Sequence, residues 1–129
     1  YSISHPPVTD YLRVAAVPFA VSQLAETAAV ASLQNHGELV ERIQGIVAER
    51  TRVVEGLRGL GWRIPEAQGN FVWLALGDDS PGFAALAAEQ GLAVRAFGSE
   101  GVRVTIGEPE ANSRFLAICA TYTKGPRVS

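Results

Sequence analysis

Two arginines in short apolar segments are the residues of this chain best suited to chemistry. Arg95 lies in the segment 93–97, Ala-Val-Arg-Ala-Phe, and Arg103 lies in the segment 102–106, Val-Arg-Val-Thr-Ile. A guanidinium offers a planar fork of donors that matches a carboxylate or a phosphate, and a strand fixes its aim better than a loop does. If both segments are strands, they predict an anion-binding wall. The alternative is two surface arginines on an ordinary sheet.

The second segment has the alternation of a strand that is buried on one face. Val102, Val104 and Ile106 fall on one face, and Arg103 falls on the other. Residues 99–101, Ser-Glu-Gly, suit a turn between the two segments. If the segments pair as a hairpin, Arg95 and Arg103 could face the same side and share one bound anion. The sequence alone does not fix that register.

Composition narrows the class of protein. The 129 residues are 47% hydrophobic and 19% charged, which fits one globular domain. The formal net charge is −2, so no overall positive field is available to hold nucleic acid or an anionic membrane. No apolar run is longer than that of 71–76, which is far shorter than the roughly 20 residues of a membrane helix, and no basic leader opens the chain. These features predict a soluble, cytoplasmic protein.

The cysteine, histidine and serine residues do not suggest a catalytic or metal site. Cys119 falls on the apolar face of a predicted helix and is expected to be a core residue. His5 and His36 are far apart in the sequence and have no Cys, His or carboxylate at ligand spacing. No serine lies in a nucleophile-elbow context. We therefore expect neither a metal nor a hydrolytic triad.

The hydrophobic pattern predicts a two-layer α+β domain. About four mostly antiparallel strands are expected to pack on helices, preceded by a long amphipathic helix. The expected elements are an irregular or weakly helical segment 1–18, helices 22–33, 38–60 and 80–91, strands 62–64, 71–76, 93–97 and 102–106, and a last helix from 109. The strand 71–76 is apolar on both faces and is expected to be covered on both sides.

Two side chains in the predicted helices have specific expected roles. Ser80 precedes Pro81 and is predicted to be the N-cap of a helix. Arg50 falls on the apolar stripe of the long helix, where its stem can pack while its head reaches solvent or a carboxylate. Both expectations depend on the local pattern alone.

Four stretches of the chain carry a family resemblance. The first is 17–22 together with the small-residue helix through 28–33, and the second is 69–74, Gly-Asn-Phe-Val-Trp-Leu. The third is 91–95. The fourth is 101–112, which begins Gly-Val-Arg-Val-Thr-Ile and ends Gly-Glu-Pro-Glu-Ala-Asn. Together they cover nearly the whole chain and resemble the C-terminal small domain of class I/II aminotransferases of fold type I. The branch is that of histidinol-phosphate and aromatic amino-acid aminotransferases. The stretch 101–112 is the most specific of the four.

The resemblance implies roles for several residues. Arg103 would bind the substrate's α-carboxylate or, in histidinol-phosphate enzymes, contribute to the phosphate site, and Arg95 matches a second anion-binding arginine. Asn70 and Phe71 match residues that approach the cleft, although they could equally form a strand that only supports the cleft wall. The strand around Trp73 favours an aromatic substrate such as phenylalanine, with histidinol phosphate as the alternative. Residues 1–18 would end the cofactor domain and its connection, and 19–129 would form the small domain.

The same resemblance implies a cofactor that this chain does not hold by itself. Family enzymes bind pyridoxal phosphate as a Schiff base on a lysine, and Tyr1 matches a tyrosine that follows this lysine in the family. The catalytic lysine is therefore expected upstream. Lys124, the single lysine here, falls in a polar tail where its amine stays protonated near its ordinary pKa of about 10.4. No catalytic or cofactor-binding residue is expected in the chain.

The resemblance thus implies a fragment that is inactive alone. Its parent would be a homodimeric aminotransferase that uses pyridoxal phosphate and takes an amino acid and a 2-oxo acid as substrates. From a different class, the same α+β outline could be a freestanding small-molecule-binding or regulatory module. In that case its arginine strands would sense an amino acid without chemistry.

Overall fold

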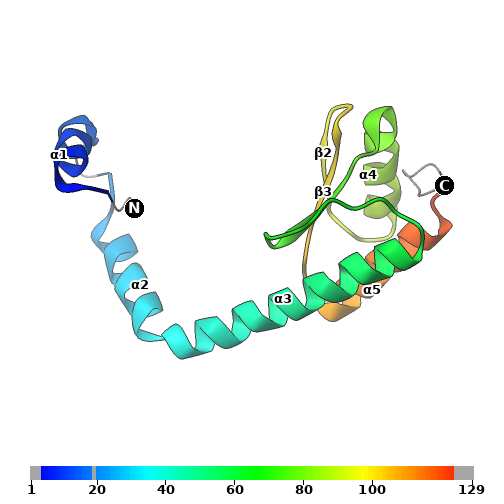
Figure 1. Cartoon of the computed structure of the whole chain (residues 1–129), viewed down its shortest axis with the longest axis horizontal. Helices are drawn as coiled ribbons and strands as arrows, with labels where there is room; N and C mark the ends of the chain where they lie inside the picture. Colours follow the sequence, from blue (N-terminus) through cyan, green and yellow to red (C-terminus); the bar gives the residue numbers. More distant parts are fainter. Residues whose placement is uncertain (1–3, 19, 124–129) are drawn as a thin grey trace. The chain divides into compact units, whose positions relative to one another are not determined.

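The computed structural model describes residues 4–18 and 20–123. The chain divides between Leu39 and Val40 into two compact units (Figure 1). Its elements, in order, are α1 (Pro6–Ala15), α2 (Gln23–Gln34), α3 (His36–Gly59), β1 (Phe71–Leu74), the short 3-10 helix η1 (Gly77–Asp79), α4 (Ser80–Glu89), β2 (Arg95–Phe97), β3 (Gly101–Thr105) and α5 (Pro109–Thr121). None of these helices is long and apolar enough to cross a membrane.

The first unit contains α1 and α2. Pro6 and Pro7 occupy the first turn of α1, where a missing backbone N–H costs no hydrogen bond. They open a regular ten-residue helix, so the expectation that residues 1–18 are irregular or only weakly helical is corrected. The helix α2 follows Ser22, whose hydroxyl accepts a hydrogen bond from the Ala25 backbone N–H at 3.2 Å.

The second unit is a two-layer α+β domain, as predicted. Its antiparallel sheet has the order β1-β3-β2, and one face of this sheet packs against α3, α4 and α5. The core residues with the lowest exposure include Val53 and Leu57 from α3, Val72 and Leu74 from β1, Val102 from β3, Phe83 from α4 and Cys119 from α5. This core fixes the backbone of all three strands.

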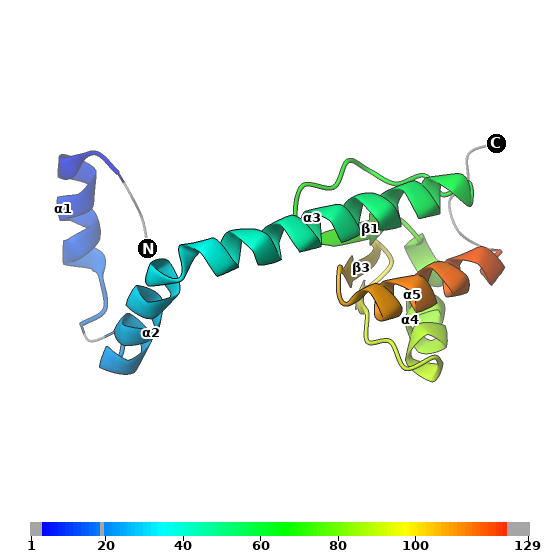
Figure 2. The ribbon, with the colours of Figure 1, turned by 90° about the horizontal axis from the view of Figure 1, so that it is seen from below.

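The second half of α3 and the helix α5 lie side by side (Figures 1 and 2). Gly56 of α3 makes the close approach possible, because a Cβ added there would lie 3.0 Å from the Leu116 side chain of α5. Cys119 is fully buried on the inner side of α5, and this burial raises the pKa of its thiol to about 12. The prediction that Cys119 is a core residue is confirmed.

The sheet has three strands, where about four were expected. Trp62 forms only an isolated bridge, and the segment 62–64 is not a strand. The left-handed Gly61, at φ 83°, turns the chain from α3 directly into the core, where the Trp62 indole N–H donates to the Cys119 carbonyl at 3.1 Å. The apolar alternation of 62–64 therefore reflects packing under α5, not pairing in a sheet.

Two further expectations are corrected around β1 and α4. The strand β1 is covered on one face only, since Val72 and Leu74 are buried whereas Phe71 is exposed. Ser80 is the first residue of α4 and not its N-cap, because the 3-10 turn η1 leads directly into the helix. The Ser80 hydroxyl instead donates to the Gly77 carbonyl at 2.6 Å.

Candidate anion-binding site

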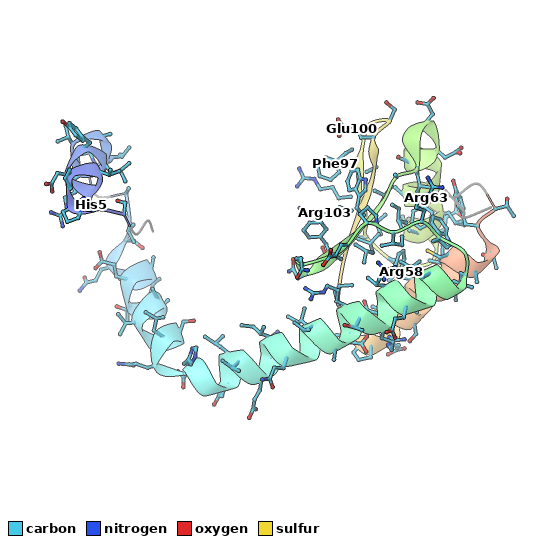
Figure 3. The ribbon with its side chains drawn as sticks, in the orientation of Figure 1. His5, Arg58, Arg63, Phe97, Glu100 and Arg103 are labelled. Carbon is cyan, nitrogen blue, oxygen red and sulfur yellow. The ribbon has the colours of Figure 1, made fainter. Side chains whose placement is uncertain are left out.

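The strand register brings the two arginines together. In the β2–β3 pair Arg95 lies directly opposite Arg103, and in the β1–β3 pair Trp73 lies directly opposite Arg103 on its other side. The neighbouring Val102 and Val104 point into the core, so this row of side chains lies on the face turned away from it. Arg103 and Phe97 project on the side of the sheet opposite α4 (Figure 3). Both arginines thus share one face.

No acidic partner neutralises either arginine within the part of the chain that the structure describes. The salt bridges found there involve Arg13, Arg52 and Arg114. Arg95 is exposed and Arg103 is half-buried, and the Nε of Arg103 is buried without a hydrogen-bond partner. Like charges directly opposite on neighbouring strands repel, and an unsatisfied buried N–H is costly. A carboxylate or phosphate held between the two guanidinium groups would relieve both costs.

Aromatic rings pack against both guanidinium groups. The Cζ of Arg103 lies 5.8 Å from the centroid of the Phe71 ring, and the Cζ of Arg95 lies 4.9 Å from that of Phe97. The Trp73 and Phe97 ring centroids are 5.6 Å apart. Cation–π contacts of this kind hold the flat face of a guanidinium and leave its donor edge available. The site therefore combines positive charge with an apolar surface.

Gly101 allows the Trp73 ring to lie close to the sheet. A Cβ at position 101 would collide with the Leu74 carbonyl oxygen and would lie 2.5 Å from Cζ2 of Trp73. Gly101 is itself buried and lies opposite Phe97 in the hairpin. A side chain here would push Trp73 away from Phe97, so glycine is a requirement of the aromatic cluster.

Asn70 lies at the start of β1, next to Phe71. Its backbone carbonyl accepts a hydrogen bond from the Ile106 N–H at 2.8 Å, which extends the pairing of β1 with the chain beyond β3. The Asn70 residue is exposed. The structure thus places Asn70 just before β1, and its contact with substrate stays a prediction.

A polar network behind the site was not predicted from the sequence. The Glu49 carboxylate of α3 accepts two hydrogen bonds from Arg52, at 2.9 and 2.8 Å, and one from Asn112 Nδ2 at 2.8 Å. These hydrogen bonds lower the pKa of Glu49 to about 2. Asn112 also accepts from the Gly107 N–H at 3.0 Å and donates to the Gly107 carbonyl at 2.8 Å. The network ties α3 to the turn that follows β3.

One local signal could have indicated part of this network. Glu49 and Arg52 are three residues apart on a predicted helix, a spacing at which opposite charges meet. Asn112 ends the most specific stretch of the family resemblance, but its partner Glu49 lies 63 residues away in sequence. The fold alone brings these two residues together.

The described residues do not fit pyridoxal phosphate as a covalent site. A Schiff base requires a lysine amine, and the chain's one lysine, Lys124, lies outside the described residues, as does Tyr1. Between residues 4 and 123, with residue 19 left aside, no group of three or more His, Cys, Asp and Glu could hold a metal ion. His5 directly precedes α1, and His36 begins α3. The arginine pair has the chemistry of an anion-binding site, and that role stays a prediction.

The second unit is thus an α+β domain with Arg95 and Arg103 side by side on one sheet face and no acidic partner among the described residues. Residues 1–118 match the family described as aminotransferase class I and II, and the chain belongs to this family. The resemblance inferred from the sequence is therefore confirmed.

Similar proteins agree with this assignment. The chain is 52% identical over 124 residues to the aromatic amino acid aminotransferase of Streptomyces avermitilis and 51% identical over 124 residues to that of Thermobifida fusca. Each match covers 96% of this chain and 34% of the relative, so the chain spans about a third of the length of these curated relatives. A crystal structure described as an aminotransferase of Burkholderia pseudomallei aligns with a TM-score of 0.76 and 27% identity, over 88% of this chain and 36% of that one.

Proposed function

We propose that the full-length protein containing this chain transfers an amino group from an aromatic amino acid, such as phenylalanine, to a 2-oxo acid. Family membership supports the reaction class and the use of pyridoxal phosphate. The names of the relatives support the aromatic substrate. In this proposal residues 1–18 end the cofactor domain and 19–129 form the small domain of a cytoplasmic homodimer. The chain itself contributes substrate binding.

The observation that carries the proposal is the in-register, unneutralised pair of Arg95 and Arg103, with the orphaned Nε of Arg103. Arg103 would hold the substrate's α-carboxylate with two parallel hydrogen bonds, and Arg95 would supply the second positive charge. Asn70 would line the edge of the same site. The rings of Trp73 and Phe97 add an apolar surface that suits an aromatic side chain.

Kinetics on the full-length protein test the substrate. We expect kcat/KM for phenylalanine to exceed that for histidinol phosphate, whose phosphate could use the same two arginines. A preference of about a hundredfold for histidinol phosphate would assign the protein to the other branch of the family. Both substrates are compared under the same 2-oxo acid concentration.

Substitution of Arg103 tests its proposed role in binding the substrate's α-carboxylate, which we call the carboxylate clamp. Arg103→Lys is expected to raise KM for phenylalanine about tenfold or more, because an ammonium cannot reproduce a two-pronged contact with a carboxylate. Arg58→Lys is the matched control, since Arg58 is an exposed residue of α3 whose side chain makes no hydrogen bond or ion pair among those described. Unchanged kinetics in Arg103→Lys would remove Arg103 from the site.

Activity and binding measurements on the isolated 129-residue chain distinguish an enzyme fragment from a freestanding sensor. As a fragment it should show no transamination, and calorimetry should show only weak binding of phenylalanine, because much of the binding surface is missing. Micromolar binding by the isolated chain would instead support a regulatory module. Turnover by the isolated chain with added pyridoxal phosphate would contradict the fragment interpretation.

A further inference from the structure

Arg50 links α3 to the loop that leads into β1. Its Nη1 donates to the Gln68 carbonyl at 2.6 Å and to the Gly69 carbonyl at 3.0 Å. The sequence favoured solvent or a carboxylate as the partner of this guanidinium, and the structure shows two backbone carbonyls instead. These carbonyls immediately precede Asn70 and Phe71. A single side chain of α3 thus holds the loop at the point where it enters the sheet.

No other hydrogen bond among the described residues joins this loop to the helix layer. Among the hydrogen bonds of the described residues, the loop 65–69 makes one besides those of Arg50, between the Gln68 side chain and Glu66 within the loop itself. The next connection is the bond from the Ile106 N–H to the Asn70 carbonyl, which belongs to the sheet. Arg50 therefore supplies the polar contacts that fix the loop to the helix layer.

The loop that Arg50 holds contacts the arginine site through the ring of Phe71. A Cβ added at Gly69 would lie 2.8 Å from Cε1 of Phe71, so the Phe71 ring lies directly over the Gly69 backbone. The same ring lies 5.8 Å from the Cζ of Arg103. A shift of the Gly69 backbone would therefore move the surface against which the Arg103 guanidinium packs.

We propose that Arg50 is a positioning residue of the substrate site: by holding the Gln68 and Gly69 carbonyls, it fixes Phe71 against Arg103. Arg50 touches neither substrate nor reacting atoms in this role. It acts on the aim of the Arg103 guanidinium, and its effect is on substrate binding and not on the chemical step. The inference rests on the proposed role of Arg103 in carboxylate binding.

A double-mutant cycle on the full-length protein tests this coupling. Arg50→Gln is expected to raise KM for phenylalanine about fivefold while kcat stays within about twofold. The Kd for 3-phenylpropanoate, which carries the carboxylate without the amino group, should rise by a similar factor and gives a measurement independent of turnover. In a Phe71→Leu background the same Arg50→Gln change should alter KM and Kd by less than about twofold. An equal effect in both backgrounds would overturn the proposal.

Further variants distinguish positioning from a loss of stability or of charge. Arg50→Lys keeps a donor for both carbonyls and should restore KM to within about twofold of the original value. Arg58→Gln removes the same charge two turns along α3 and should leave KM unchanged. If Arg50→Gln does not fold, Gly69→Ala displaces the Phe71 ring directly and should raise KM in its place. No rise in KM for either Arg50→Gln or Gly69→Ala would contradict the inference.

The kinetics of Arg103→Lys show whether a failure concerns the role of Arg50 or the proposed function itself. If Arg103→Lys leaves KM unchanged, the carboxylate clamp itself is wrong. If Arg103→Lys raises KM and Arg50→Gln does not, the clamp stands and only the positioning role of Arg50 fails.

Discussion

Replacing Arg103 by methionine should make the isolated 129-residue chain more stable, although it removes the proposed clamp. The arginine has a buried Nε without a partner and lies directly opposite Arg95, with no acidic group to neutralise either. Methionine matches the arginine side chain as far as the Nε position, carries no charge and places apolar atoms there in place of the unpaired N–H. The side chain proposed to bind substrate is therefore predicted to cost folding free energy when no anion is bound.

The size of the effect follows from three contributions. An unsatisfied buried N–H costs about 1–3 kcal/mol, with the lower end appropriate to a half-buried residue. Repulsion from the opposite Arg95 adds a few tenths of a kcal/mol, since that residue is exposed. The cation–π contact with Phe71, worth about 0.5–1 kcal/mol, acts in the other direction. The sum is a net gain of about 0.5 kcal/mol for Arg103→Met, or a rise of about 2 °C in Tm.

Urea denaturation followed by circular dichroism measures this gain. Arg95→Met removes the repulsion together with the cation–π contact to Phe97, and these effects oppose each other. It should therefore change the unfolding free energy by less than about 0.3 kcal/mol, as should the control Arg58→Met. Added carboxylate should raise the midpoint of the original chain and not that of Arg103→Met. A lower midpoint for Arg103→Met would refute the reasoning, because the guanidinium would then be part of the folded structure's own stability.

Two further predictions concern the elements that hold the site. Gly101→Ala should destabilise the chain by about 2–3 kcal/mol, because the added Cβ collides with the Leu74 carbonyl. The control Gly82→Ala has open space around it and should change the unfolding free energy by less than about 1 kcal/mol. Equal urea midpoints for the two variants would contradict this prediction. The pKa of Glu49 falls from 4.5 to about 2 on folding, so its stabilising effect is complete above about pH 4.5 and is lost as the pH falls towards 2. Glu49→Gln should flatten the dependence of the unfolding free energy on pH in this window, while the exposed Glu110→Gln should not; a slope unchanged by Glu49→Gln would show that this carboxylate does not carry the effect.

Local patterns in the sequence predicted the elements that position the site. The long helix, the last helix from Pro109 and the alternation along 102–106 all depend on periodic burial, and the structure has α3, α5 and β3 at these places. The sequence could place Arg95 and Arg103 on one face only if their segments paired as a hairpin in the right register. A pairing register depends on two segments at once, so neither segment alone predicts it. The register found in the β2–β3 hairpin meets that condition.

Other features escaped prediction because their causes are not local. The segment 62–64 alternates like a strand, but Trp62 is buried by an aromatic cluster with Phe83 and Tyr122 that forms only in the fold. The hydrogen bonds from Asn112 to Glu49 and from Arg50 to Gln68 join residues far apart in the sequence. In each case the residue type was visible, whereas its partner depended on tertiary packing.

The pairing of β2 with β3 also limits how this region can vary in length. Residues 98–100 connect the two strands and are exposed, so insertions there leave the pairing of the strands unchanged. Loss of one residue within Gly101–Thr105 would exchange the two faces of the strand, sending a guanidinium into the hydrophobic interior and turning valines towards water. Homologues that keep the arginine pair should therefore differ in length at the hairpin tip and not within the strand.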